Sequence, residues 1–141
     1  SLPSGLFANN INVTTFQYIF QNCSNLVTIP SDLFITNNIV STFRYAFYAC
    51  TSIIEIPSDL FTSNSNATQF DNTFAYCDSL TTIPTNLFHV SVTYLNSTFA
   101  RCIGLLELPV GLFDNYVNLT SFDRTFSKLS ILAPILLTSF D

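Results

Sequence analysis

The four cysteines are the most reactive side chains of this sequence, and they recur regularly at Cys23, Cys50, Cys77 and Cys102. This spacing is unlike the Cys-x-x-Cys pairs that hold zinc, and the single histidine, His89, cannot complete a ligand set. Disulfides between neighbouring repeats are the alternative, since stacked cysteines would lie near disulfide distance. Because all four cysteines share one position beside Phe and Leu, we favour buried free thiols that donate weakly to backbone carbonyls. We expect no metal and no cofactor.

Glu55 and Glu107 are the only glutamates, and a pair of carboxylates is the usual machinery of glycoside hydrolysis. On parallel strands about 4.8 Å apart, two layers would separate them by roughly 10 Å. Inverting glycosidases hold their carboxylates about 6.5–9.5 Å apart, so this pair is slightly too wide. The pattern predicts neither a pocket nor burial that would tune a pKa. We therefore expect no catalytic residue and no enzymatic activity.

A solvent-exposed binding column is the interpretation that we favour for the two glutamates. They share a repeat position that is occupied in turn by Thr28, Glu55, Thr82 and Glu107. The neighbouring position contributes Ile54 and Leu106, which would form an apolar contact stripe if they are exposed. Packing of these two side chains against an adjacent loop is the alternative. His89 has no partner for nucleophilic catalysis and is expected on the surface.

Five Asn-x-Ser/Thr sequons offer sites for N-glycosylation: Asn12, Asn22, Asn66, Asn96 and Asn118. Asn12, Asn66 and Asn118 share one repeat position, so glycans on them would form a column. The same residue types are also favoured in turns and helix caps, so the motif can arise without glycosylation. Both interpretations stay open.

A repeat of 25–27 residues positions all these side chains. The prolines lie at Pro3, Pro30, Pro57, Pro84, Pro109 and Pro134. Fourteen of the fifteen phenylalanines fall in three columns, which begin at Phe7, Phe16 and Phe20. We expect a single domain, residues 1–141, with units at 3–29, 30–56, 57–83, 84–108 and 109–133 and a partial unit at 134–141.

Each unit carries two patterns of secondary structure. The spacing of Val13, Phe16, Phe20 and Cys23 predicts a short helix, with Thr14 as its cap. The Leu-x-x-Ile-Pro segment that follows each cysteine predicts a short strand that ends at the proline. Stacking such units predicts an α/β solenoid with short parallel strands on one face and short helices on the other.

The recurring motif Phe-x-x-Cys-x-x-Leu-x-x-Ile resembles leucine-rich repeats of the BspA-like type. It is seen as FQNCSNLVTI, FYACTSIIEI, FAYCDSLTTI and FARCIGLLEL, and the resemblance covers about residues 3–134. The chain differs from commoner leucine-rich repeats in using Phe for many Leu and Cys where Asn is usual. The resemblance implies a curved, right-handed superhelix with its strands on the concave side. It also implies a surface or secreted protein similar to adhesins that bind host or matrix proteins.

Composition excludes several classes of partner. The net charge is −5, and only four residues are basic, which argues against nucleic acid and against anionic membranes. No apolar stretch reaches the ~18 residues of a membrane-spanning helix. We expect a non-enzymatic extracellular or cell-surface module that recognises or adheres to a protein or glycan. The alternative is a structural subunit that self-associates through its solenoid ends, residues 1–7 and 131–141, into a head-to-tail filament.

Overall fold

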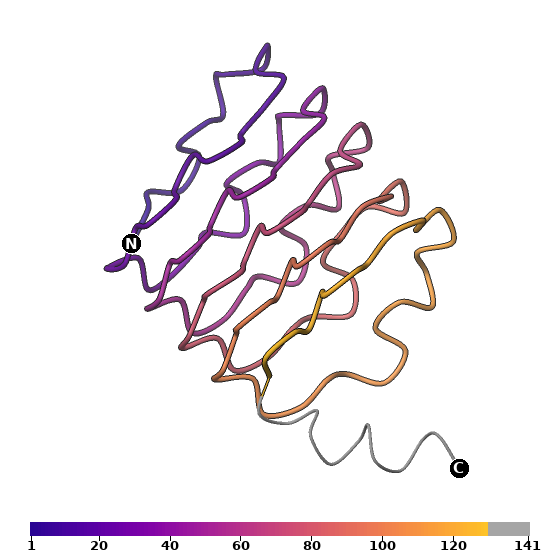
Figure 1. The fold of residues 1–141 in the computed structure, drawn as a ribbon. Helices are drawn as coiled ribbons and strands as arrows, with labels where there is room; N and C mark the ends of the chain where they lie inside the picture. The colour runs from indigo at the N-terminus through magenta and orange to yellow at the C-terminus, as the bar shows by residue number, and fades with distance from the viewer. Residues whose placement is uncertain (130–141) are drawn as a thin grey trace, which may run out of the picture.

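The computed structural model describes residues 1–129, and Figure 1 shows them as coils of chain stacked side by side along one axis. The predicted partial unit at 134–141 and the predicted contact end at 131–141 lie outside the described residues. Backbone bridges join each coil to the next in parallel, and they pair residues that are 27 or 25 positions apart. The repeat read from the sequence therefore matches the spacing of contacts in space.

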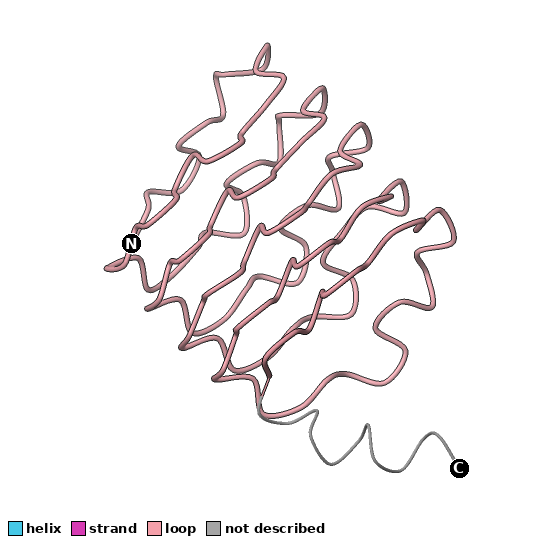
Figure 2. Ribbon diagram, viewed as in Figure 1, coloured by secondary structure: helices cyan, strands magenta, loops and turns pink. Residues whose placement is uncertain are grey.

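No regular helix or strand forms among residues 1–129, which consist of turns, loops and single bridging residues (Figure 2). The helices that we predicted at Phe16 to Cys23 and its equivalents are therefore wrong. The predicted strands at Leu-x-x-Ile-Pro are also not formed, and these segments meet through few hydrogen bonds, such as Thr81 N to the Ile54 carbonyl at 3.1 Å. Within the described range there is likewise no helix long and apolar enough to cross a membrane.

Parallel pairing occurs instead in the segments that the sequence predicted as helices. We call these five segments the turn ladder: residues 15–23, 42–50, 69–77, 94–102 and 121–129. In the second segment, the N–H groups of Phe43, Tyr45, Phe47 and Ala49 donate to carbonyls of the third segment at 2.8–3.1 Å. The N–H groups between them close local turns, as when Tyr48 N donates to the Tyr45 carbonyl at 3.2 Å. Every N–H from Phe43 to Cys50 therefore has an acceptor without helix or sheet.

A left-handed residue every fourth position makes this chain of turns possible. Ten residues other than glycine have positive φ, and all ten belong to the turn ladder. They occupy two columns of the repeat, which start at Tyr18 and Asn22. None is β-branched, because a branched Cβ would clash most severely in this conformation. Between these positions, side chains such as those of Phe43, Phe47 and Cys50 are completely buried, and their spacing of 4 and 3 imitates the 3.6-residue period of a helix.

The backbone strain at these positions leads to a stability prediction. Ala49 has a φ of 56°, and glycine adopts such an angle without a Cβ penalty. We expect Ala49→Gly to raise the free energy of unfolding by about 0.5–1 kcal/mol, measured by urea denaturation. Ala46, which is fully buried and has no positive φ, is the matched control, and Ala46→Gly should lower stability. Equal losses in both variants would contradict the left-handed conformation at Ala49.

Phenylalanine fills the centre of the solenoid, one column stacked on the next. In the Phe20 column, ring centroids lie 5.3 Å apart between Phe20 and Phe47 and again between Phe47 and Phe74. The rings of Phe47 and Phe74 are almost parallel, with an interplanar angle of 1°. Both side chains are completely buried. Stacked aromatic burial between coils is therefore the main apolar contribution to stability.

Three of the four cysteines confirm the prediction of buried free thiols. Cys50, Cys77 and Cys102 are buried, and each Sγ donates to a phenylalanine carbonyl of the preceding coil at 3.1–3.3 Å. Burial raises the pKa of the Cys102 thiol to about 12, so it stays protonated as a donor at neutral pH. Cys23 differs, since it lies in the first coil and is exposed.

Buried asparagines join the loops between coils. Asn37 and Asn64 are fully buried, and each amide nitrogen donates to two carbonyls of the coil before it. For Asn64 these are the carbonyls of Phe34 and Asn37, at 3.0 and 3.1 Å. No motif in the sequence marks these two residues, although they share one repeat position with Asn10.

Candidate functional site

The predicted binding column is exposed, as expected. Thr28, Glu55, Thr82 and Glu107 all face the solvent. Ile54 and Leu106 are 49% and 74% exposed, so they do not pack against a loop. However, the column lies outside the turn ladder and lines neither of the two cavities described below. The structure therefore shows that the column is accessible and that it lies outside the turn ladder and both cavities.

The sequons differ in how accessible their amides are. Asn12, Asn22 and Asn66 are exposed. Asn118 is also exposed, but its Nδ2 donates to the Val90 carbonyl at 3.0 Å. The Asn96 Nδ2 donates to Asp71 Oδ1 at 2.7 Å in a half-buried setting. Because glycosylation occurs at this nitrogen, Asn96 is the least suitable acceptor of the five.

Tyrosine and basic residues concentrate on the turn ladder. Five of the six tyrosines and all four basic residues belong to its segments. Its outward side chains, which we call the ladder face, come from the repeat positions of Thr15, Gln17, Tyr18, Gln21 and Asn22. The ladder contains four basic and two acidic residues, a net charge of +2, whereas six acidic residues and no basic one lie in the other segments of residues 1–129. Positive charge is therefore concentrated in the ladder segments.

The tyrosines form a continuous row across the first three coils. Ring centroids are 5.1 Å apart between Tyr18 and Tyr45, 5.5 Å between Tyr45 and Tyr48, and 5.2 Å between Tyr48 and Tyr76. Arg101 of the fourth coil continues the row, with its guanidinium 5.1 Å from the centre of the Tyr76 ring. Stacking and the cation–π contact hold these side chains in place before any partner binds.

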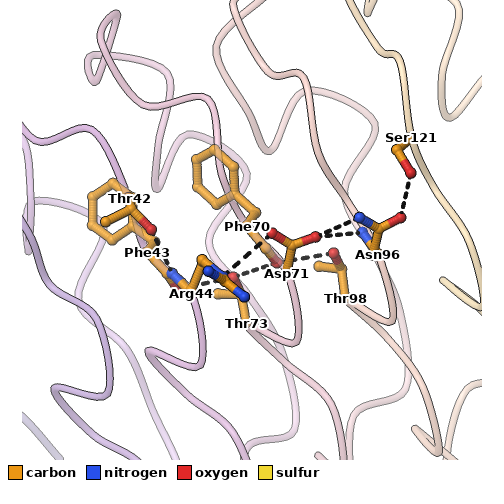
Figure 3. Close-up of polar contacts among 9 residues, drawn as sticks. All are labelled: Thr42, Phe43, Arg44, Phe70, Asp71, Thr73, Asn96, Thr98 and Ser121. Carbon is orange, nitrogen blue, oxygen red and sulfur yellow. Dashed lines mark hydrogen bonds and ion pairs between the residues drawn. The ribbon is translucent and has the colours of Figure 1, made fainter.

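The ladder face also carries a row of polar side chains, Arg44, Asp71, Asn96 and Ser121, which Figure 3 shows. Arg44 Nε lies 3.5 Å from Asp71 Oδ2, and the other carboxylate oxygen accepts from Asn96 Nδ2 at 2.7 Å. Asn96 Oδ1 in turn accepts from Ser121 Oγ at 2.6 Å. The row thus connects four successive coils through side chains alone.

Part of this polar row has a structural task. At the repeat position of Gln17, four of the five N–H groups of the ladder donate to side chains and not to backbone carbonyls. Asp71 Oδ1 accepts from Asn96 N at 3.2 Å, and Asn96 Oδ1 accepts from Asp123 N at 2.9 Å. Thr42 Oγ1 does the same for Arg44 N at 3.3 Å. Asp71 and Asn96 therefore stabilise the ladder, which leaves the guanidinium of Arg44 as the part of the row most available to a partner.

A depression of about 410 Å³ lies on the ladder face above this row. It is lined by Arg44, Gln69, Asp71, Asn72, Tyr94 and Asn96. Tyr94 is 40% exposed and Arg44 presents 42% of its side chain to solvent. The lining combines a cation, a carboxylate, amides and one aromatic ring, which suits recognition of a polar side chain. Among residues 1–129, no three His, Cys, Asp or Glu side chains gather to hold a metal.

The ladder face was missed because its segments were assigned to helices. A signal for it does exist in the sequence. Every basic residue and five of the six tyrosines fall in the segment of the repeat that begins at the position of Thr15 and ends at that of Cys23. A segregation of Tyr and Arg to one segment type indicates a recognition surface regardless of secondary structure.

Neither a protein-family model nor a curated protein matches the sequence. Among solved structures, a leucine-rich repeat protein of T. pallidum is 18% identical, with a TM-score of 0.45 over 86% of this chain and 52% of that one. A leucine-rich repeat protein from Bacteroides ovatus is 19% identical, with a TM-score of 0.42 over 89% of this chain and 38% of that one. The structure of the Toll–Spatzle complex of Drosophila contains a chain that is 17% identical, with a TM-score of 0.44 over 88% of the present chain and 19% of its own length.

The present chain thus spans about half or less of each of these three solved chains. All three TM-scores are below 0.5 and all three identities are below 20%, so the BspA-like leucine-rich-repeat type stays a prediction from the sequence motif.

Proposed function

We propose that this chain is a non-enzymatic protein-recognition module at a cell surface or outside the cell, and that its ladder face binds the partner. The observation that carries the proposal is the concentration of all basic residues and five of six tyrosines on that one face. Arg and Tyr are enriched in the parts of interfaces that supply most of the binding energy. A chance distribution would have spread them over all parts of the repeat.

Pre-organisation of the face supports the same proposal. Association costs about 0.5–1.5 kcal/mol for each flexible side chain that must be ordered at an interface. Without a partner, the tyrosine row is stacked, and the Arg101 guanidinium lies over the Tyr76 ring. These side chains therefore lose little conformational freedom on binding, which makes them effective contacts.

Charge indicates the kind of partner. The basic residues Arg101, Arg124 and Lys128 belong to the fourth and fifth segments of the ladder, and Arg124 presents 76% of its side chain to solvent. An acidic partner would be attracted to this end of the face and repelled by the acidic remainder of the molecule. We infer a protein with an exposed acidic and aromatic segment as the partner. The low overall charge and the exposed sequons support an extracellular location.

The competing surface is the column of Thr28, Glu55, Thr82 and Glu107, and one experiment separates the two. The probe is a fluorescein-labelled peptide of alternating Glu and Tyr, with alternating Lys and Tyr as its charge control. We expect the acidic peptide to bind, and its affinity to fall steeply as salt rises from about 20 to about 300 mM. Fluorescence anisotropy measures the affinity of each peptide and its dependence on salt.

Two variants that change the net charge equally identify the face. Arg124→Glu and the double variant Thr28→Glu with Thr82→Glu each alter the charge by −2. We expect Arg124→Glu to weaken binding on the order of tenfold at low salt and the double variant to have little effect. The reverse order would assign the partner to the competing column. Equal losses, or no binding of the acidic peptide to the unaltered protein, would refute recognition by the ladder face.

A further inference from the structure

The fourth unit breaks the repeat, and the break lies away from the ladder. Phe88 and Leu95 are two residues closer in sequence than their equivalents Phe34 and Phe43. The shortened loop has no counterpart of the buried Asn64. Instead, Tyr116 reaches back from the fifth unit, where its hydroxyl accepts from Phe88 N at 3.2 Å and donates to the Thr85 carbonyl at 3.0 Å.

A cavity of about 310 Å³ opens beside Tyr116 and Phe88. Its lining includes Asn86, Phe88, His89, Val90, Asn115 and Tyr116, together with two threonines. The volume is at the lower end of the ~300–1,000 Å³ range of small-molecule pockets, which is enough for one ring and its substituents.

Hydrogen bonds fix the polar groups of the lining. His89 Nδ1 accepts from Ser91 N at 3.2 Å, which places the proton of the neutral ring on Nε2 and makes that atom a donor. Asn86 Nδ2 donates to Asp59 Oδ1 at 2.8 Å, so its carbonyl oxygen stays available as an acceptor. No hydrogen bond within residues 1–129 engages the Asn115 side chain, which is exposed and offers both a donor and an acceptor.

The chemistry of the lining selects a class of ligand. No Lys or Arg lines the cavity, which disfavours an anion, and no Asp or Glu lines it, which disfavours a cation. Phe88, Val90 and the ring of Tyr116 supply an apolar wall, whereas two amides, an imidazole and two hydroxyls supply hydrogen bonds. A ligand with one C–H face and several neutral hydroxyl groups satisfies both halves of this lining. We propose that the cavity binds a single neutral pyranose sugar, independently of any partner on the ladder face.

Saturation-transfer NMR with free monosaccharides tests the proposal. The probes are the methyl glycosides of glucose, galactose, mannose and N-acetylglucosamine, with glucuronic acid and glucosamine as charged controls. We expect at least one neutral glycoside to bind with a dissociation constant in the millimolar range, and the two charged sugars to bind more weakly. Failure of every neutral glycoside at tens of millimolar, or tighter binding of a charged sugar, would overturn the proposal.

Variants locate the sugar on the molecule. Asn115→Ala removes hydrogen-bonding groups that no described residue uses, so it should fold normally and weaken binding about tenfold. Val90→Trp should fill the cavity and abolish binding, because Val90 is 51% exposed and can be enlarged without disturbing the core. Val117→Trp is the control, since Val117 is 84% exposed and lies outside the lining. Unchanged binding in Asn115→Ala and in a folded Val90→Trp would place the sugar elsewhere and refute this site.

Discussion

Replacing Phe47 by alanine is expected to lower the free energy of unfolding by about 3–5 kcal/mol, the usual cost of removing a fully buried phenylalanine. Phe47 is completely buried and stacks on Phe20 and on Phe74, each at 5.3 Å. It also contacts Phe34 at 6.2 Å between ring centroids. The variant leaves a cavity between three coils, and the rigid ladder limits how far the neighbouring coils can collapse into it. Urea denaturation followed by tyrosine fluorescence measures the loss.

Phe122→Ala is the matched control for this prediction. Phe122 belongs to a phenylalanine column of the same repeat, but 57% of it is exposed. We expect its replacement to cost less than about 1 kcal/mol, since little apolar surface is lost from the core. Equal effects of the two variants would mean that the stacked rings do not form the core described here.

Asn64→Ala should lower the free energy of unfolding by about 2–3 kcal/mol. The Asn64 amide donates to the carbonyls of Phe34 and Asn37, and each buried hydrogen bond contributes about 1 kcal/mol. Loss of the side chain also leaves a small void in a fully buried position. The same denaturation measurement applies, and proteolysis of the loop between Phe61 and Phe70 should become faster, because this side chain joins that loop to the preceding coil.

Two further variants give this prediction its controls. Asn38→Ala removes an exposed asparagine from the equivalent loop of the preceding unit, and we expect almost no change. Asn64→Asp keeps the size of the side chain but replaces the donor by an ionised acceptor facing two carbonyls. It should be at least as destabilising as alanine at neutral pH. An Asn64→Asp variant as stable as the parent protein would contradict the hydrogen bonds to Phe34 and Asn37.

Much of the burial pattern could be predicted from the sequence because the same residue types recur at equivalent positions of the repeat. The phenylalanine and cysteine columns predicted which side chains are buried, and Phe47, Phe74 and Cys77 are indeed fully buried. The exposure of Glu55 was also predicted, whereas the pattern left the exposure of Ile54 open. These successes depend only on aligning equivalent positions, since a residue that stacks on its own equivalent must lie on the same side in every coil.

The local backbone could not be predicted in the same way. A chain of turns with one left-handed residue in every four places inward side chains at spacings of 3 and 4, as an amphipathic helix does. Only the conformations of residues such as Tyr18 and Asn22 distinguish the two structures, and in most coils these positions hold residues other than Gly or Asn. Tyrosine, arginine and serine at such positions carry no sequence signal for positive φ. The prediction of a strand face and a helix face was therefore wrong as well, because neither element forms in residues 1–129.

The candidate site was missed for a related reason. The two glutamates suggested chemistry because they are the only ones in the sequence, but they are exposed and line neither cavity. The Arg44–Asp71 pair joins residues 27 positions apart, and only the register of the ladder brings them within 3.5 Å. The segregation of tyrosine and basic residues was visible in the sequence, but it had meaning only once their segments were known to form one face.

Scalar couplings across hydrogen bonds, measured by NMR on isotope-labelled protein, test the central claim most directly, namely that these segments form a ladder of turns that presents one recognition face. The account predicts couplings from the amide nitrogens of Tyr45 and Phe47 to the carbonyl carbons of Asp71 and Thr73, which belong to the next coil. Couplings from Phe47 to the Phe43 carbonyl, four residues earlier, would show a helix. That result would contradict the ladder and, with it, the face on which Tyr45, Arg101 and Arg124 lie together.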